Sequence, residues 1–143
     1  MTKTLRRLAR IQRIQRDQAR SEFASAQRVQ MDHDAALKAC ESHLHDTRLI
    51  RSTDADDLMR CHAYTLRQEM RRRSLAAQAI PIDDFVEQRR QSLVDAARRV
   101  ETTERYADRL DETLADDRQR RDQRHLDEAG LQVWLRRQFT ENH

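Results

Sequence analysis

Apolar and small residues recur at steps of three and four along the first 50 residues of the chain. This spacing puts side chains on one face of an α-helix and is typical of a coiled-coil seam. We therefore predict one long helix, the first arm, over residues 2 to about 50. Polar residues at several seam positions predict weak packing. The expected seam consists of Leu5, Leu8, Ile11, Gln15, Ala19, Phe23, Ala26, Gln30, His33, Leu37, Cys40, Leu44 and Thr47.

A turn is predicted at residues 51–57, followed by a return arm from about residue 54 to 114. Thr53 and Asp56 resemble a capping box at its start. The first part of this arm is expected to place one stripe at Leu58, Cys61 or His62, Leu66, Met70, Arg73 and Ala77. Further on, a heptad repeat places its seam at Val86, Leu93, Ala96, Val100, Thr103, Ala107, Leu110 and Leu114.

Pro81 is the only proline, and it is expected to kink or break the return arm. With a tip near residue 52, residue i lies roughly opposite residue 104 − i. Residues from about 115 to 143 then overhang the first arm, which agrees with the end of the apolar repeat at Leu114. The predicted fold is all-α: a long antiparallel two-armed coiled-coil hairpin, forming a single rod over residues 1–143.

Composition supports a rod with little interior. The chain has one glycine and one proline in 143 residues, and 28 basic side chains nearly balance 25 acidic ones. Charges of both signs suit the surface of a long helix. Residues 1–28 hold eight basic and two acidic groups, whereas residues 101–117 hold seven acidic and two basic groups. An antiparallel hairpin brings these two stretches together.

Several classes of function find no support in the sequence. No apolar run is long enough to span a membrane, and no signal peptide is expected. There is no phosphate-binding loop and no nucleophile motif, so we expect no enzyme and no cofactor. Cys40, His43, Cys61 and His62 are of residue types that hold zinc, but the side chains of the adjacent pair Cys61 and His62 diverge by about 100° on a helix, which favours ordinary seam packing. Nucleic-acid binding through the basic first turns is likewise disfavoured, because no aromatic residues are interleaved there.

An apolar cluster returns near the C-terminus, at Leu131, Trp134, Leu135 and Phe139. The first three lie at i, i+3 and i+4 and so share one helical face. On an otherwise solvated overhang, this face predicts a docking site for a partner. The alternative is that these side chains only cap the end of their own helix.

Two segments resemble the FliJ/YscO-type proteins of flagellar and injectisome type III export. The first is Leu5-Arg6-Arg7-Leu8-Ala9-Arg10-Ile11-Gln12-Arg13-Ile14-Gln15-Arg16-Asp17-Gln18-Ala19, which is similar to the opening helix of that family. The second is Arg121-Asp122-Gln123-Arg124-His125-Leu126-Asp127-Glu128-Ala129, similar to the family's charged stretch near the C-terminus. Overall length and the two-armed plan agree with the family, whereas Pro81 departs from a straight second helix. The opening helix slightly favours the injectisome version.

The resemblance implies a cytoplasmic, non-catalytic stalk, peripheral to the membrane-associated export apparatus. Such a stalk binds inside the export ATPase hexamer and links it to the export gate protein and to export chaperones. Arg6, Arg10 and Arg13, which step along one face, are then expected to contact the ATPase ring. The alternative is a homo-oligomeric coiled-coil scaffold or regulator, with or without nucleic acid.

Overall fold

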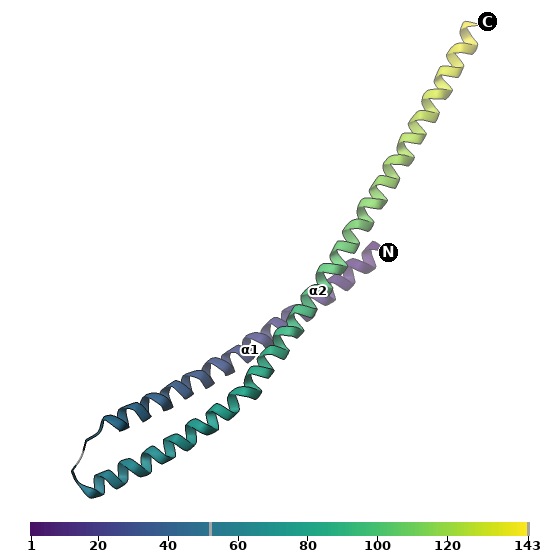
Figure 1. The fold of residues 1–143 in the computed structure, drawn as a ribbon. Coiled ribbons are helices and arrows are strands. Elements are labelled where there is room, and N and C mark those ends of the chain that lie inside the picture. The colour runs from purple at the N-terminus through teal and green to yellow at the C-terminus, as the bar shows by residue number, and fades with distance from the viewer. Residues whose placement is uncertain (52, 143) are drawn as a thin grey trace. The chain divides into compact units, whose positions relative to one another are not determined.

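The chain forms two long α-helices that pack against each other. The computed structural model describes residues 1–51 and 53–142. Helix α1 spans Thr2–Leu49 and helix α2 spans Ala55–Glu141, joined by a short connection (Figure 1). No strand occurs among the described residues. The all-α prediction is therefore confirmed.

Helix α2 begins with a side-chain cap. The Asp54 carboxylate accepts a hydrogen bond from the backbone N–H of Asp56 at 3.1 Å. The backbone carbonyl of Asp54 accepts the N–H of Leu58 at 3.0 Å, which closes the first turn. The cap is thus Asp54, one residue after the predicted Thr53, and the acidic residues that follow suit the positive end of the helix dipole.

The contacts within the chain define two compact units. The central unit is Arg13–Arg98, and the terminal unit combines Met1–Gln12 with Arg99–His143. Each unit contains a segment of α1 and a segment of α2, and each has its own line of buried residues.

Small residues form the seam of the central unit. Its buried residues are Ala19, Ala26, His33, Cys40, Leu44 and Ala96. Alanine at a helix–helix contact shortens the distance between the two axes, because little side chain separates the backbones. Half-buried residues of α2, among them Leu75, Ile82 and Val86, complete the layers. The seam is therefore narrow and holds few large apolar side chains.

The terminal unit has a shorter seam of the same kind. Ala9 of α1 and Val100 and Ala107 of α2 are buried. Leu5 and Leu110 are half-buried beside them. Leu114, the last expected seam residue, is 40% exposed, so the packed part of α2 ends just before it.

The predicted seam of α1 is wrong in its first turns. Leu8, Ile11 and Gln15 are exposed, and Ala9, Gln12 and Arg16 lie on the seam instead. From Leu5 onward the true seam alternates steps of four and three without exception, which keeps it facing its partner in a coiled coil. The prediction followed the largest apolar side chains, but the heptad period determines the buried face.

The predicted stripe on the first part of α2 is also wrong, except at Cys61. The other expected members, Leu58, His62, Leu66, Met70, Arg73 and Ala77, are all exposed. Cys61, Thr65, Gln68, Leu75, Ala79 and Ile82 face the seam in their place. These positions continue backwards the heptad phase of Val86 to Leu110, which the structure confirms as buried or half-buried.

Helix α2 runs through Pro81, so the predicted break does not occur. Proline leaves the carbonyl four residues earlier, that of Ala77, without its usual N–H partner. Pro81 and Ala77 are both exposed, and water can therefore satisfy that carbonyl. The helix tolerates Pro81 because this residue lies on the solvent-exposed face of α2.

Cross-helix contacts in the central unit correct the predicted register. Arg89 donates to the Glu22 carboxylate at 2.8 Å, and Gln30 donates to the Asp83 carboxylate at 2.7 Å. The simple hairpin rule pairs residue 30 with residue 74 instead. Side-chain layers of the two heptad stripes set the register, and the position of the turn alone does not.

Candidate partner-binding surfaces

The last part of α2 lacks a buried face. Every residue from Asp111 to Asn142 is exposed, and we call this stretch the C-terminal segment. At its start, the Asp111 carboxylate accepts a hydrogen bond from Arg6 of α1 at 2.8 Å. Beyond Asp111 the side-chain hydrogen bonds described are local, such as Gln123 to the Asp127 carboxylate at 3.1 Å, one turn along the helix. In proteins most of the stability of a helix comes from tertiary packing, which this segment lacks. The segment is therefore available to a partner.

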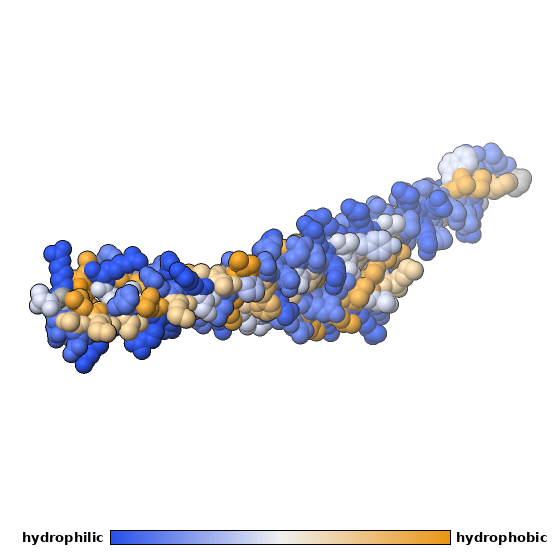
Figure 2. All heavy atoms as spheres, turned by 60° about the horizontal axis from the view of Figure 1, so that its bottom comes forward, coloured by the Kyte–Doolittle hydropathy of each residue, from blue (hydrophilic) through white to orange (hydrophobic). Residues whose placement is uncertain are grey.

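The predicted apolar cluster lies in this segment and is exposed. Trp134 is 54% exposed and Phe139 is 71% exposed, with Leu131 and Leu135 similarly accessible. Figure 2 shows apolar side chains gathered near the C-terminal end of α2, beyond a hydrophilic stretch. Aromatic and leucine side chains on one helical face are the usual anchors of helix-in-groove recognition.

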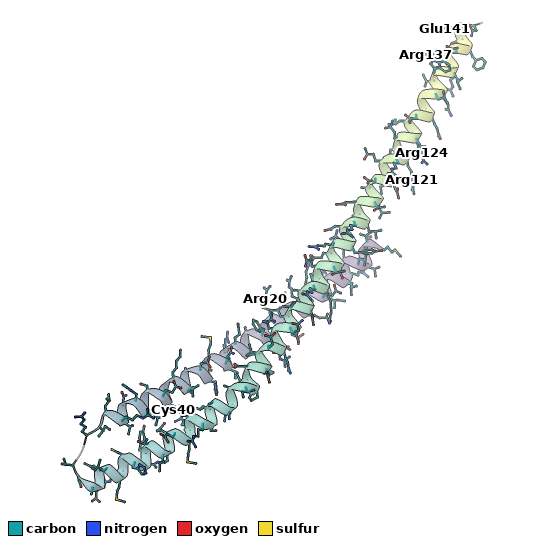
Figure 3. All side chains as sticks on the ribbon, viewed as in Figure 1. Arg20, Cys40, Arg121, Arg124, Arg137 and Glu141 are labelled. Carbon is teal, nitrogen blue, oxygen red and sulfur yellow. The ribbon has the colours of Figure 1, made fainter. Side chains whose placement is uncertain are left out.

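Charged residues lie along the C-terminal segment before the apolar cluster and among its residues. The basic residues Arg121, Arg124 and Arg137 and the acidic Glu141 project from the same segment (Figure 3). A carbon added at Gly130 meets no atom within 4 Å, so this glycine is not required by close packing within the chain. The segment combines a charged surface with an apolar end.

The predicted arginine row on α1 is divided. The Arg6 guanidinium donates to the carboxylates of Asp111 and Asp108, at 2.8 Å each, and these hydrogen bonds raise the pKa of Arg6 above its ordinary value. Arg10 lines a shallow basic groove with Thr2, Lys3, Arg6, Arg7 and Asp111. Arg13 belongs to the central unit. Arg6 is thus engaged within the chain, whereas Arg10 lies in an open groove.

Charge pairing between the helices is only partly as expected. Arg6 joins the basic stretch of α1 to the acidic stretch of α2, as the opposite charges suggest. In the pair of Glu22 with Arg89, α1 supplies the acidic residue and α2 supplies the basic one, which is the opposite of the expected arrangement. Exposed pairs of this kind contribute little to stability and mainly select a register.

The cysteine and histidine residues weighed as metal ligands make ordinary contacts. The Cys40 thiol donates to the backbone carbonyl of Gln68 at 3.2 Å, between the two helices (Figure 3). His43 Nδ1 lies 3.1 Å from the Tyr64 hydroxyl. Over the described part of the chain, no three His, Cys, Asp or Glu side chains gather as a metal site.

A second apolar stripe on α2 was predicted in part from the sequence, but it was assigned to the seam and not to the exposed face. Met59, Leu66, Met70 and Ile80 are all exposed, although two of them were predicted to lie inside the seam. If the heptad repeat is extended backwards from Val86 through Ile82, these four residues fall on the face of α2 that points away from the seam. That signal was present in the sequence, but the larger side chains obscured it.

Comparisons with known proteins leave the family open. No protein-family model, curated protein or solved structure matches the chain. Within residues 1–51 and 53–142, neither helix contains an apolar stretch long enough to cross a bilayer.

Proposed function

We propose that this chain is a non-catalytic stalk protein of a type III export apparatus, similar in role to the FliJ/YscO-type proteins that two of its segments resemble. In this role it binds inside the export ATPase hexamer. It links the ATPase to the export gate protein and to export chaperones. It acts in the cytoplasm, peripheral to the membrane-associated apparatus.

The exposure of the C-terminal segment is the observation that supports this proposal most. At ~1.5 Å per residue, a helix over residues 111–141 is on the order of 45 Å long. A helix without an intrachain partner gains stability when surrounding subunits bury it. The charged stretch gives a weak, mobile contact suited to a shaft, and the apolar cluster gives an anchor near its end.

We also infer that α1 and α2 run antiparallel, as a stiff hairpin requires. In the central unit, Glu22, Gln30 and Cys40 contact residues of α2 in descending order, namely Arg89, Asp83 and Gln68. The loss of one backbone hydrogen bond at Pro81 further leads us to expect a bend in α2 there.

Affinity purification followed by reconstitution tests the proposal. The tagged full chain is recovered from its own cells, and the export ATPase that accompanies it is purified and assayed with and without the chain. We expect stimulation of ATP hydrolysis that is lost in a Trp134→Ala/Leu135→Ala variant. Leu126→Ala, at another exposed apolar residue of the same segment, is the matched control and should keep the stimulation.

The basic groove gives a second test of the same proposal. Arg10→Glu should weaken stimulation, and more so at low salt, where screening of charges is least. Arg20→Glu makes the same change on an exposed residue of α1 in the central unit and should have a smaller effect (Figure 3). If no export ATPase accompanies the chain, or if every variant stimulates as the wild type does, the stalk proposal is wrong.

The exposed apolar cluster also suits a homo-oligomeric scaffold. Sedimentation equilibrium separates this alternative from the stalk. A dimer or tetramer that dissociates on Trp134→Ala/Leu135→Ala would favour the scaffold, because the cluster is then occupied by copies of the chain. A monomer under the same conditions favours a partner of another kind.

A further inference from the structure

The second apolar stripe of α2 is the largest feature of the central unit that the stalk role does not use. It alternates steps of four and three and lies on the exposed side of the helix. Met59, Met70 and Ile80 are 68–72% exposed, and Leu66 is 47% exposed. We call it the outer stripe, and it consists of Met59, Ala63, Leu66, Met70, Arg73, Ala77 and Ile80.

The spacing of the outer stripe indicates a helical partner. A strict heptad period runs along the axis of a coiled coil, so a third helix could follow it over several turns. Figure 2 shows apolar side chains exposed among hydrophilic ones near the connection between α1 and α2. Methionine side chains adapt to varied apolar surfaces, which suits a docking face.

The charges beside the stripe define the partner. Arg60 and Arg67 flank it and Arg73 interrupts it, and none of these three forms an ion pair within the described chain. The only acidic residue between residues 58 and 82 is Glu69. Its carboxylate lies 3.9 Å from Arg48 of α1. Over residues 58–82 the stripe therefore has a net positive rim, bordered at its two ends by Asp56, Asp57, Asp83 and Asp84.

This rim argues against a second copy of the chain as the occupant. Two copies packed through the same stripe would bring their arginines together, and like charges at such positions are destabilising. An anionic membrane surface would accept the arginines, but interfacial helices usually insert tryptophan, phenylalanine or several leucines. Residues 58–81 contain neither tryptophan nor phenylalanine. The heptad spacing and the modest apolar side chains fit a helix better than a lipid surface.

We propose that the outer stripe of α2 is a docking site for an acidic amphipathic helix of another protein, which pairs with α2 on the side of this helix that faces away from α1. The partner presents leucine-like residues to Met59, Leu66 and Met70 and glutamates to the flanking arginines. This inference uses only the central unit, and it stands whether or not the stalk proposal is correct.

Binding of a designed helical peptide to the full chain tests this site. The probe is a fluorescein-labelled four-heptad peptide with leucine at positions a and d and glutamate at e and g, measured by fluorescence anisotropy. We expect saturable binding that weakens at least about tenfold between low and moderate salt, as charge pairing requires. A peptide of identical composition in scrambled order, and one with lysine in place of glutamate, should bind at least about tenfold more weakly.

Matched variants locate the binding site. Met59→Gln/Met70→Gln removes two large apolar side chains of the stripe, and Arg60→Glu/Arg67→Glu reverses the charge beside it. Each should weaken binding of the glutamate peptide by at least about tenfold. Met31→Gln, at an exposed methionine of α1, should leave binding unchanged. Because all these residues are exposed, circular dichroism should show unchanged helicity.

Three results would overturn the proposal. The first is binding of the peptide that the stripe variants do not reduce. The second is self-association of the chain that Met59→Gln/Met70→Gln abolishes, which would make a second copy the occupant. The third is flotation of the chain with phosphatidylserine vesicles, abolished by the same variant, while the glutamate peptide fails to bind.

Discussion

Replacing His33 with leucine should stabilise the chain, because this histidine is the buried polar residue of the central seam. It is 8% exposed, and its Nε2 has no hydrogen-bond partner. On the other side of the ring, Nδ1 lies 4.0 Å from the Asp34 carboxylate, which is a weak contact at best. An unsatisfied buried polar group costs about 1–3 kcal/mol. Leucine has a similar size and suits a seam position.

We therefore expect His33→Leu to raise the free energy of unfolding by about 1–3 kcal/mol, since it removes the unsatisfied group and adds apolar contact. Urea unfolding followed by far-ultraviolet circular dichroism measures the change as a shift in midpoint at constant slope. His45→Leu, the same substitution at an exposed position of α1, is the control and should change the midpoint little. A His33→Leu chain no more stable than the wild type would show that the imidazole is satisfied in solution and refute the reasoning.

Further predictions concern the register, the proline, the tryptophan and the terminal ion pair. With Cys40 and Cys61 replaced by serine, cysteines at positions 30 and 83 should be joined efficiently by a short bismaleimide cross-linker of roughly 10 Å, because the side chains of Gln30 and Asp83 reach each other across the two helices whereas a direct disulfide needs closer Cβ atoms; efficient linkage of positions 30 and 74 instead would contradict the register. Pro81→Ala should raise the free energy of unfolding, by at most about 3 kcal/mol, because alanine restores the helix hydrogen bond; a decrease in the urea midpoint would mean that the proline is required by the fold. Trp134, the only tryptophan, should be readily quenched by acrylamide in the free chain, and a protected, blue-shifted emission from the monomer would show that the cluster is packed. Arg6→Gln should lower the melting temperature slightly at low salt and less at about 0.5 M salt, because screening weakens its exposed pairs with Asp108 and Asp111; a difference independent of salt would point to packing of the side chain instead.

Helix content and the general position of the turn follow from the sequence alone. One glycine and one proline in 143 residues leave few places for the backbone to turn, and the cluster of polar residues after Leu49 is the strongest of them. The heptad repeat from Val86 to Leu110 was also readable, because its seam positions hold apolar or small residues except at Arg89. Local propensity and periodicity were sufficient for these features.

The buried face of the other segments was decided by the tertiary structure. In α1, the larger Leu8 and Ile11 lie outside while Ala9 lies inside, because the two helices approach closely and require a continuous 3.5-residue period. In α2 the same rule exposes Met70 and turns Gln68 inward, where its backbone carbonyl accepts the Cys40 thiol. Hydrophobicity judged one residue at a time cannot identify the buried face when a helix has two apolar stripes.

Some features of the candidate sites also follow from the sequence, whereas others depend on the tertiary structure. The sequence by itself determined the apolar cluster around Trp134, because no apolar repeat connects it to the seam that ends near Leu114. Only the tertiary structure decided that Arg6 is held by Asp108 and Asp111, and that the methionines of α2 face outward. The physical reason is that a register shift of a few residues changes which charges meet across two helices, and a phase shift of one residue turns a side chain by about 100° around its helix. Both quantities are fixed by how the two stripes interlock, and neither helix specifies them alone.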